Sequence, residues 1–111
     1  MIKSISSSSF ENKIKNVLVD NDDCWFSSHN EDQLIEINLS EETYIKNITI
    51  EYQQGFACEK GELILFHNDE IFLSPLADTN TVNRKITQIK VKLMKSQDLY
   101  NRFCIYRIII N

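Results

Sequence analysis

The stretch DNDDCWFSSHNEDQLIEINL (residues 20–39) decides the fold, because it joins a turn-rich loop to a segment with alternating apolar positions. Acids and amides at residues 20–23 favour turns, and the only tryptophan of the chain, Trp25, follows them closely. Beyond a polar loop, apolar side chains recur at every second position from Ile35 to Leu39, which is typical of a strand with one buried face. The stretch therefore predicts a loop that leads into a strand of a β-sandwich.

The same period of two continues towards the middle of the chain. It predicts strands near residues 45–52, 62–66 and 71–73, separated by turns at SEET (residues 40–43) and HNDE (residues 67–70). Only two glycines and one proline are present. We therefore expect Asn or Asp at some turn positions that usually hold glycine.

A further strand is predicted after Pro75. A polar connection at residues 77–85 precedes the stretch ITQIKVKLM (residues 86–94), in which apolar residues alternate with two lysines. These lysines, Lys90 and Lys92, are expected to face solvent or a partner, while the apolar side chains between them face the core.

The final segment, RFCIYRIII (residues 102–110), is dense in apolar residues. This is typical either of a central strand covered on both faces or of a terminal strand held firmly in the sandwich. Six to eight short strands with regular turns predict an all-β, jelly-roll β-sandwich. A chain of 111 residues predicts a single domain, residues 1–111. Within it, the serine-rich residues 1–9 predict an irregular arm, and the apolar spacing at residues 10–18 permits a short helix or turn.

Composition suggests where the protein works. No apolar run approaches the roughly 18 residues that span a bilayer, and the first residues lack the apolar block of a secretory signal. Three cysteines, Cys24, Cys58 and Cys104, are an odd number with no close pair in sequence, so reduced thiols are expected. A soluble, cytoplasmic protein without membrane attachment is the expectation.

The charge of the chain is unevenly distributed. Residues 1–78 hold fifteen acidic and five basic side chains, whereas residues 79–111 hold one acid, Asp98, and seven bases. The two parts therefore carry net charges of −10 and +6. This asymmetry suggests that different surfaces attract partners of opposite charge, and the alternative is an ordinary solvated surface.

An acidic cluster raises the question of a calcium site. Asp20, Asp22 and Asp23 are closely spaced carboxylates, the ligand type that Ca²⁺ prefers. Cys24 and Trp25 then occupy positions where an EF-hand loop needs a small ligand and a glycine, so an EF-hand is excluded. A structural calcium ion in a sandwich loop is the alternative that stays open, and no other cofactor is expected.

Catalytic patterns are absent from the sequence. His29 and His67 are the only histidines, and neither lies beside a cysteine or acid at zinc-like spacing. No GxSxG elbow or comparable nucleophile motif occurs. The sequence therefore predicts a binding protein and no enzyme.

Two aromatic residues are candidates for ligand contact. Trp25 is expected to fill the core beneath the sandwich, with a ligand-stacking platform as the alternative. Phe56, in the loop QQGFACEKG, is expected either to pack under its loop or to contact a partner. Lys90 and Lys92, spaced by two, suit a phosphate backbone or an acidic protein surface. Since aromatics are not interleaved with these lysines, generic nucleic-acid binding is only weakly indicated, whereas a site on a larger ribonucleoprotein stays open.

Several motifs resemble a known group of sandwich proteins. The loop VDNDDCWFSS resembles the corresponding loop of discoidin-like, or galactose-binding-like, domains such as coagulation factor type C and Doc domains. Three separated blocks are similar, in the same order, to the small nuclear-receptor-associated proteins of this fold, a lineage that includes short microsporidian dormancy factors. The matching residues are Asp20, Cys24, Trp25, Gln53, Gly55, Phe56, Asp98, Arg102, Ile105 and Tyr106.

The chain also departs from that pattern. Gln54 and Asn101 stand where glycine is usual. The sugar-binding residues of galactose-binding relatives are not matched, so lectin activity does not follow from the resemblance.

The resemblance implies a ribosome-bound dormancy protein. Such a protein occupies the exit-site region of the small subunit, contacts its proteins and rRNA, and silences translation by blocking tRNA and mRNA. A monomer that binds no DNA is expected, and the alternative is an adaptor in a protein complex, as in Doc-like domains. Asp20, Cys24, Trp25, Asp98 and Tyr106 are then signatures of the fold. The expected contact residues are Gln53, Gln54, Gly55, Phe56, Lys60, Arg84, Lys85, Lys90, Lys92, Tyr100 and Arg102.

Overall fold

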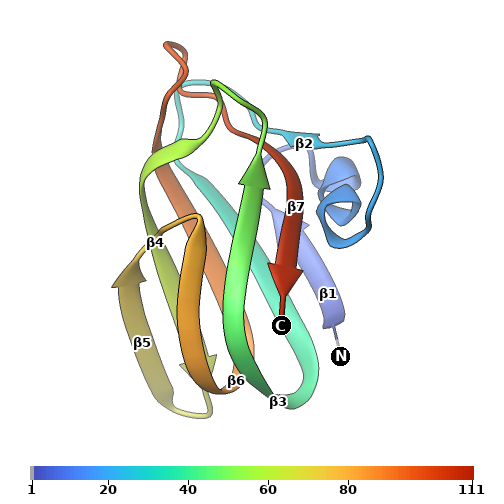
Figure 1. The fold of residues 1–111 in the computed structure, drawn as a ribbon, viewed down its shortest axis with the longest axis vertical. Coiled ribbons are helices and arrows are strands. Elements are labelled where there is room, and N and C mark those ends of the chain that lie inside the picture. Colours follow the sequence, from blue (N-terminus) through green and yellow to red (C-terminus); the bar gives the residue numbers. More distant parts are fainter. Residues whose placement is uncertain (1) are drawn as a thin grey trace.

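Two long, bent strands organise the computed structural model, which describes residues 2–111 (Figure 1). They are β3 (Gln33–Tyr52) and β6 (Thr79–Ser96), and they pair antiparallel in two blocks. The register between them shifts between Asn38 and Thr43, where both strands bend. Each strand therefore contributes one half to each layer of a β-sandwich.

The other elements complete the two layers. One layer has the order β1-β3-β6-β4-β5, and the other has the order β2-β7-β3-β6. A 3₁₀ helix, η1, packs beside the sandwich against β1, β2 and β7 (Figure 1). The bounds are β1 (Ile2–Ser7), η1 (Glu11–Leu18), β2 (Trp25–Phe26), β4 (Cys58–His67), β5 (Glu70–Pro75) and β7 (Cys104–Ile110).

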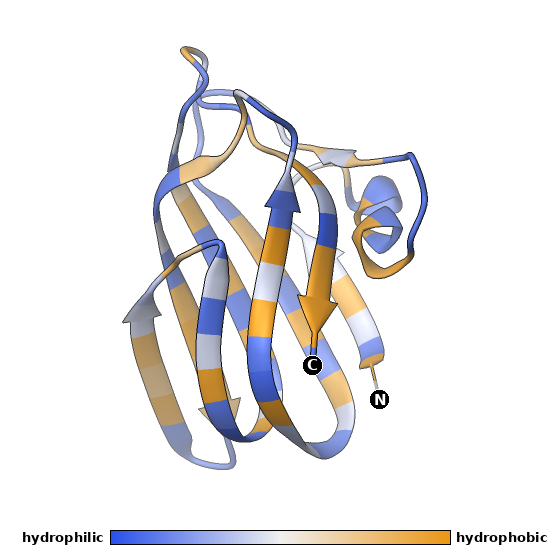
Figure 2. Cartoon of the chain, viewed as in Figure 1, coloured by the Kyte–Doolittle hydropathy of each residue, from blue (hydrophilic) through white to orange (hydrophobic). Residues whose placement is uncertain are grey.

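Apolar and polar residues alternate along the strands (Figure 2), and this alternation builds the core. Ile35 and Ile37 on β3 lie opposite Val91 and Ile89 on β6, and all four side chains are fully buried. Between Ile45 and Asn47 the register shifts again, so buried positions resume three residues later at Ile48. The predicted apolar faces of these strands are therefore confirmed. Other large, fully buried side chains are Trp25, Ile14, Leu63, Ile86, Leu93, Phe103 and Ile105.

Two predicted connections are strands instead. The SEET segment does not reverse the chain, because β3 continues through its exposed residues 40–42 and only bends. The polar residues 79–85 form the first half of β6. The strand was not predicted because a polar residue, Asn80, occupies a buried position where the pattern requires an apolar one. The Asn80 Oδ1 accepts the Ala77 N–H (2.8 Å), and its Nδ2 donates to the Ile48 carbonyl (3.1 Å). A buried polar residue with all its partners satisfied breaks the hydrophobic pattern without breaking the strand.

The prediction of an irregular arm at residues 1–9 is wrong. Residues 2–7 form β1, which pairs antiparallel with β3, while Met1 lies outside the described residues. The serines that obscured this strand serve as hydrogen-bonding groups. The hydroxyls of Ser8 and Ser9 both donate to Oε1 of the buried Gln33 (3.0 and 2.5 Å).

The expected short helix and the unusual turn residues are confirmed. η1 buries Ile14 and Val17. Four asparagines adopt positive φ angles of 50–60°, a conformation that Asn tolerates better than most residues with a Cβ atom. They are Asn30, Asn68, Asn83 and Asn101. Within residues 2–111, no helix has the length and apolar character needed to cross a bilayer.

Replacing Trp25 with Phe is expected to destabilise the fold. Trp25 is fully buried on β2, and its Nε1 donates to the Ser9 carbonyl (2.9 Å), which joins β2 to the end of β1. The W25F variant loses this donor and leaves the carbonyl without it, so we expect a fall of about 1–3 kcal/mol in the free energy of unfolding. Urea denaturation measures this, with Tyr44→Phe at an exposed site as the control. Equal midpoints for the two variants would contradict the assigned role of Trp25.

Candidate functional site at the loop end

Three loops gather at one end of the sandwich, the upper end in Figure 1, opposite the bends of β3 and β6. They are the β2–β3, β3–β4 and β6–β7 loops. The Gln97 amide donates to the Ala57 carbonyl (2.9 Å), and the Asn30 amide donates to the Tyr100 carbonyl (3.0 Å). Backbone hydrogen bonds thus fix the β6–β7 loop to both neighbours. We call this surface the loop end.

An arginine surrounded by aromatic rings lies at the centre of the loop end. The Arg102 guanidinium carbon is 5.5 Å from the ring centroids of Phe26 and Phe56 and 5.4 Å from that of Tyr100. Its Nε donates to Asp98 Oδ2 (2.7 Å), and its Nη2 donates to Oδ1 (3.3 Å). This two-pronged pairing orients the guanidinium plane, and the rings add cation–π attraction. Hydrogen bonds from Arg102 hold the pKa of Asp98 below its ordinary value.

A tight turn positions Asp98 and Arg102. Asn101 adopts φ 55°, the region that glycine usually occupies. Its side chain also bridges the turn, since Oδ1 accepts the Ser96 amide (2.8 Å) and Nδ2 donates to the Met94 carbonyl (3.2 Å). Asparagine therefore supplies both the backbone conformation and two hydrogen bonds that glycine lacks.

The β3–β4 loop places Phe56 against the arginine. Gly55 has φ 89°, and the Phe56 amide closes the turn onto the Gln53 carbonyl (3.0 Å). The Phe56 ring packs edge-on against Phe26, with centroids 5.2 Å apart and planes at 61°. Phe56 is half-buried. Phe56 therefore packs against Phe26 and Arg102 of the neighbouring segments, and part of its side chain stays exposed.

The predicted basic residues do not form one surface. Lys60 and Lys95 are exposed and lie opposite each other near the loop end. Arg84 and Lys85 pair with Ile45 and Tyr44 of β3, beside the register shifts at the other end of the molecule. Arg84 covers the Phe72 ring there, at 3.7 Å from its centroid. The long β6 strand therefore separates Arg84 and Lys85 from the predicted contact residues at the loop end.

The charge asymmetry of the sequence largely cancels in space. Lys85 pairs with Glu42 (3.5 Å), and Lys90 pairs with Glu36 (3.6 Å). Lys92 lies in register with Glu62 on β4. Since β6 runs between the acidic strands β3 and β4, its bases meet acids instead of forming a separate positive face. The hydrogen bond from His67 and the charge of Lys85 also lower the pKa of Glu42.

Of the signature residues, Cys24, Trp25 and Asp98 lie where the three sequence blocks meet. Trp25 pairs with Ile105 across β2 and β7, and Cys24 Sγ lies 3.0 Å from Cys104 Sγ. Asp98 is in the arginine cluster, Tyr106 is partly exposed on β7, and Asp20 is exposed. The sequence alone did not single out Phe26, because its contact with Arg102 depends on the pairing of β2 with β7.

The acidic side chains at residues 20–23 do not gather into a set of calcium ligands. Asp20, Asp22 and Asp23 are exposed, and within residues 2–111 no three acidic, histidine or cysteine side chains gather as metal ligands. The Asp23 amide instead donates a hydrogen bond to Asn21 Oδ1 (2.9 Å). The acids and amides of this loop thus serve as turn residues.

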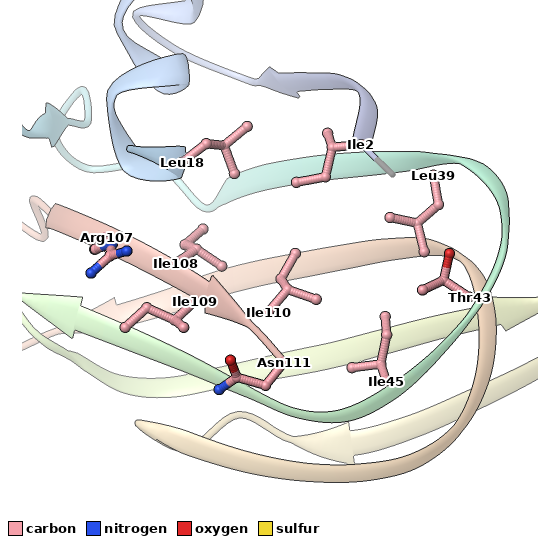
Figure 3. A pocket seen from close by; sticks show the side chains of 10 residues that line it. All are labelled: Ile2, Leu18, Leu39, Thr43, Ile45, Arg107, Ile108, Ile109, Ile110 and Asn111. Carbon is pink, nitrogen blue, oxygen red and sulfur yellow. The ribbon is translucent and has the colours of Figure 1, made fainter. Parts of the chain in front are cut away.

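Two pockets open on the surface: one lies away from the arginine cluster, and the other shares Phe26 with it. One, of about 280 Å³, opens between β7 and the strands β1 and β3; its walls are mostly isoleucine and leucine side chains (Figure 3). The other, of about 590 Å³, is bounded by η1 and by residues 22–29, and it includes Cys24 and His29. The first has few polar groups to orient a substrate, whereas the second combines apolar, charged and thiol groups.

Comparison with known proteins identifies the fold. No protein-family model and no curated protein sequence matches the chain. Solved structures do match, including a family 32 carbohydrate-binding module of Clostridium perfringens NanJ in complex with galactose. It has 18% sequence identity and a TM-score of 0.76, over 96% of this chain and 91% of that one. The fold is a discoidin-like, galactose-binding-like β-sandwich.

Other neighbours support this fold assignment. A pectin-binding carbohydrate-binding module has 18% identity and a TM-score of 0.73, over 100% of this chain and 91% of that one. The family 32 module of AlyQ, in complex with 4,5-unsaturated mannuronic acid, has 11% identity and a TM-score of 0.73, over 100% and 95%. These similarities establish the predicted β-sandwich, and at such low identity they concern the fold alone.

Lowering the pH is expected to remove the stabilisation that the ion pair between Asp98 and Arg102 gives to the folded protein. The Arg102 hydrogen bond makes the pKa of the Asp98 carboxyl lower in the folded protein than its ordinary value of 3.8. The ion pair therefore stabilises the folded protein fully at pH values above 3.8, and this stabilisation is lost as the pH falls through the lower pKa of the folded state. The difference in unfolding free energy between wild type and Asp98→Asn should therefore stay at its maximum from pH 7 to about 4, and it should decrease at lower pH. Denaturation at several pH values measures it, with the exposed-turn variant Asp69→Asn as the control. A constant difference down to pH 2 would contradict this role.

Proposed function

We propose that this protein is a non-catalytic binding module whose loop end docks on the small ribosomal subunit. In this proposal it occupies the exit-site region, blocks tRNA and mRNA, and keeps the ribosome dormant. The observation that carries the proposal is spatial. The three blocks that resemble the dormancy-factor lineage are far apart in sequence, yet Phe56 and Arg102 meet at the loop end, and Cys24 contacts Cys104 beneath it.

The chemistry of the loop end suits RNA. Leu99 and Tyr100 are 89% and 56% exposed, and the Arg102 side chain is 36% exposed beside them. Exposed aromatic rings and guanidinium planes stack on unpaired bases. Lys60 and Lys95 lie near enough to the same end to contact phosphates. A surface of this kind binds by contact alone and needs no cofactor. In this proposal the protein acts as a monomer in the cytoplasm.

Substitutions at the loop end are expected to weaken ribosome binding. Arg102→Gln removes the cation at the centre of the cluster, and Tyr100→Ser removes an exposed ring. We expect each to weaken binding about tenfold, as for other central interface residues. Cosedimentation with small subunits in sucrose gradients at increasing salt measures the change.

Matched controls come from the opposite end of the molecule. Lys85→Gln and Tyr44→Ser change the same kinds of residue near the bends of β3 and β6, and they should bind like wild type. The proposal fails if wild-type protein stays in the light fractions, or if the control variants weaken binding as much as the loop-end variants do.

A second candidate function is an adaptor in a protein complex. One observation favours it: the outer faces of β4 and β5 expose apolar side chains in paired positions. Ile71 lies opposite Phe66 and Leu73 lies opposite Ile64, and Ile71 and Leu73 are 60% and 64% exposed. An apolar patch of this kind on an edge strand is typical of a protein-binding surface.

The two proposed functions predict that different substitutions abolish binding. If the adaptor function holds, Ile71→Ser with Leu73→Ser should remove the partner proteins that a tagged chain recovers from its own cells. Arg102→Gln should leave that recovery unchanged. Quantitative mass spectrometry of the recovered complexes measures both, and loss of the same partners in both variants would argue against a separate adaptor surface.

A further inference from the structure

Two cysteines that are far apart in sequence meet beneath the loop end. Cys24 precedes β2 and Cys104 begins β7, and their sulfur atoms are 3.0 Å apart. A disulfide bond has a length of about 2.05 Å. The two sulfurs therefore need to approach by only about 1 Å, on strands that are already paired through Trp25 and Phe26.

The two thiols differ in access. Cys24 is half-buried and lines the pocket of about 590 Å³ beside η1, so a small solute can reach it. Cys104 is fully buried. Its thiol donates to Cys24 Sγ and also lies 3.3 Å from Gln53 Oε1. Burial, together with the hydrogen bond that the Cys104 thiol donates to Cys24, raises the pKa of Cys104 to about 12. An oxidant arriving from solvent therefore meets Cys24 first.

We propose that Cys24 and Cys104 form a peroxide-sensitive dithiol that closes to a disulfide and loosens the β3–β4 loop. The Cys24 sulfur attacks one oxygen of hydrogen peroxide, the O–O bond breaks, and a sulfenic acid and water result. The Cys104 sulfur then attacks the Cys24 sulfur, the S–O bond breaks, and a second water leaves with the remaining thiol proton. In total, two thiols and one hydrogen peroxide give one disulfide and two waters.

The disulfide acts on the loop end through Gln53. In the reduced protein, the backbone of Cys104 accepts the Gln53 amide (2.9 Å) and donates to the Phe56 carbonyl (3.3 Å). The Cys104 sulfur also lies 3.3 Å from Gln53 Oε1. A disulfide bond replaces its 3.0 Å contact with Cys24 Sγ and leaves no thiol proton that could reach Gln53. The loop that holds Phe56 against Arg102 then loses one of its attachments. An effect of oxidation on ribosome binding rests on the proposed function, whereas the loosening of the loop does not.

Mass spectrometry of the oxidised protein tests the bond. Reduced full-length protein is treated with hydrogen peroxide, and we expect a Cys24–Cys104 cross-linked peptide with loss of two hydrogens. Cys58 is the matched control, since it is also half-buried but bonds to the Lys60 carbonyl (3.1 Å). Cys58→Ser should form the same cross-link, and Cys24→Ser should not. Oxidation of Cys24 to sulfinic acid without a cross-link would overturn the proposal.

Hydrogen exchange of the unmutated protein tests the effect on the loop. Oxidation should make the amides of residues 53–57 exchange several times faster, while the β4–β5 turn at residues 67–70 stays unchanged. Equal exchange in the two redox states would overturn the coupling. Ribosome cosedimentation of both states forms the last comparison. If only the reduced form binds, the loop controls binding; if neither form binds, the proposed function fails while the results on the cross-link and the loop stand.

Discussion

The antiparallel pairing of β3 with β6 is the constraint on which the rest of the structure depends. Both strands bend, and their register shifts between Asn38 and Thr43, so a single pair of strands supplies the middle of both layers. All other strands except β2 and β5 pair directly with one of them. Because the side-chain period of a strand is two, each shift also resets which residues face the core. That is how Ile45 and Ile48 are both buried.

The same pairing determines what the two ends of the sandwich can do. The bend end holds Lys85 and Glu42 in an exposed ion pair. At the loop end, the three loops that connect these strands lie side by side. There Asp98 orients Arg102 among three aromatic rings. A cation that is oriented but still partly exposed suits recognition, because little side-chain freedom is lost on binding.

The contrast between charge in sequence and charge in space has a simple origin. The basic residues of β6 and the acidic residues of β3 and β4 belong to neighbouring strands, so lysines such as Lys90 face glutamates such as Glu36 across a distance of 3.6 Å. Net charges of −10 and +6 in two parts of the chain therefore do not produce two faces. Cysteines behave in the opposite way: Cys24 and Cys104 look isolated in sequence, and strand pairing brings their sulfurs together.

The sequence by itself determined the all-β class, the buried faces of most strands and the core role of Trp25, because alternation and burial depend on local patterns. Positive φ angles at four asparagines likewise followed from the scarcity of glycine. Tertiary structure alone decided that the serine-rich start is a strand, that residues 79–85 belong to β6, and that Phe26 and Cys104 lie at or beneath the loop end. These features depend on hydrogen bonds and packing between residues far apart in the chain, which a local pattern does not contain.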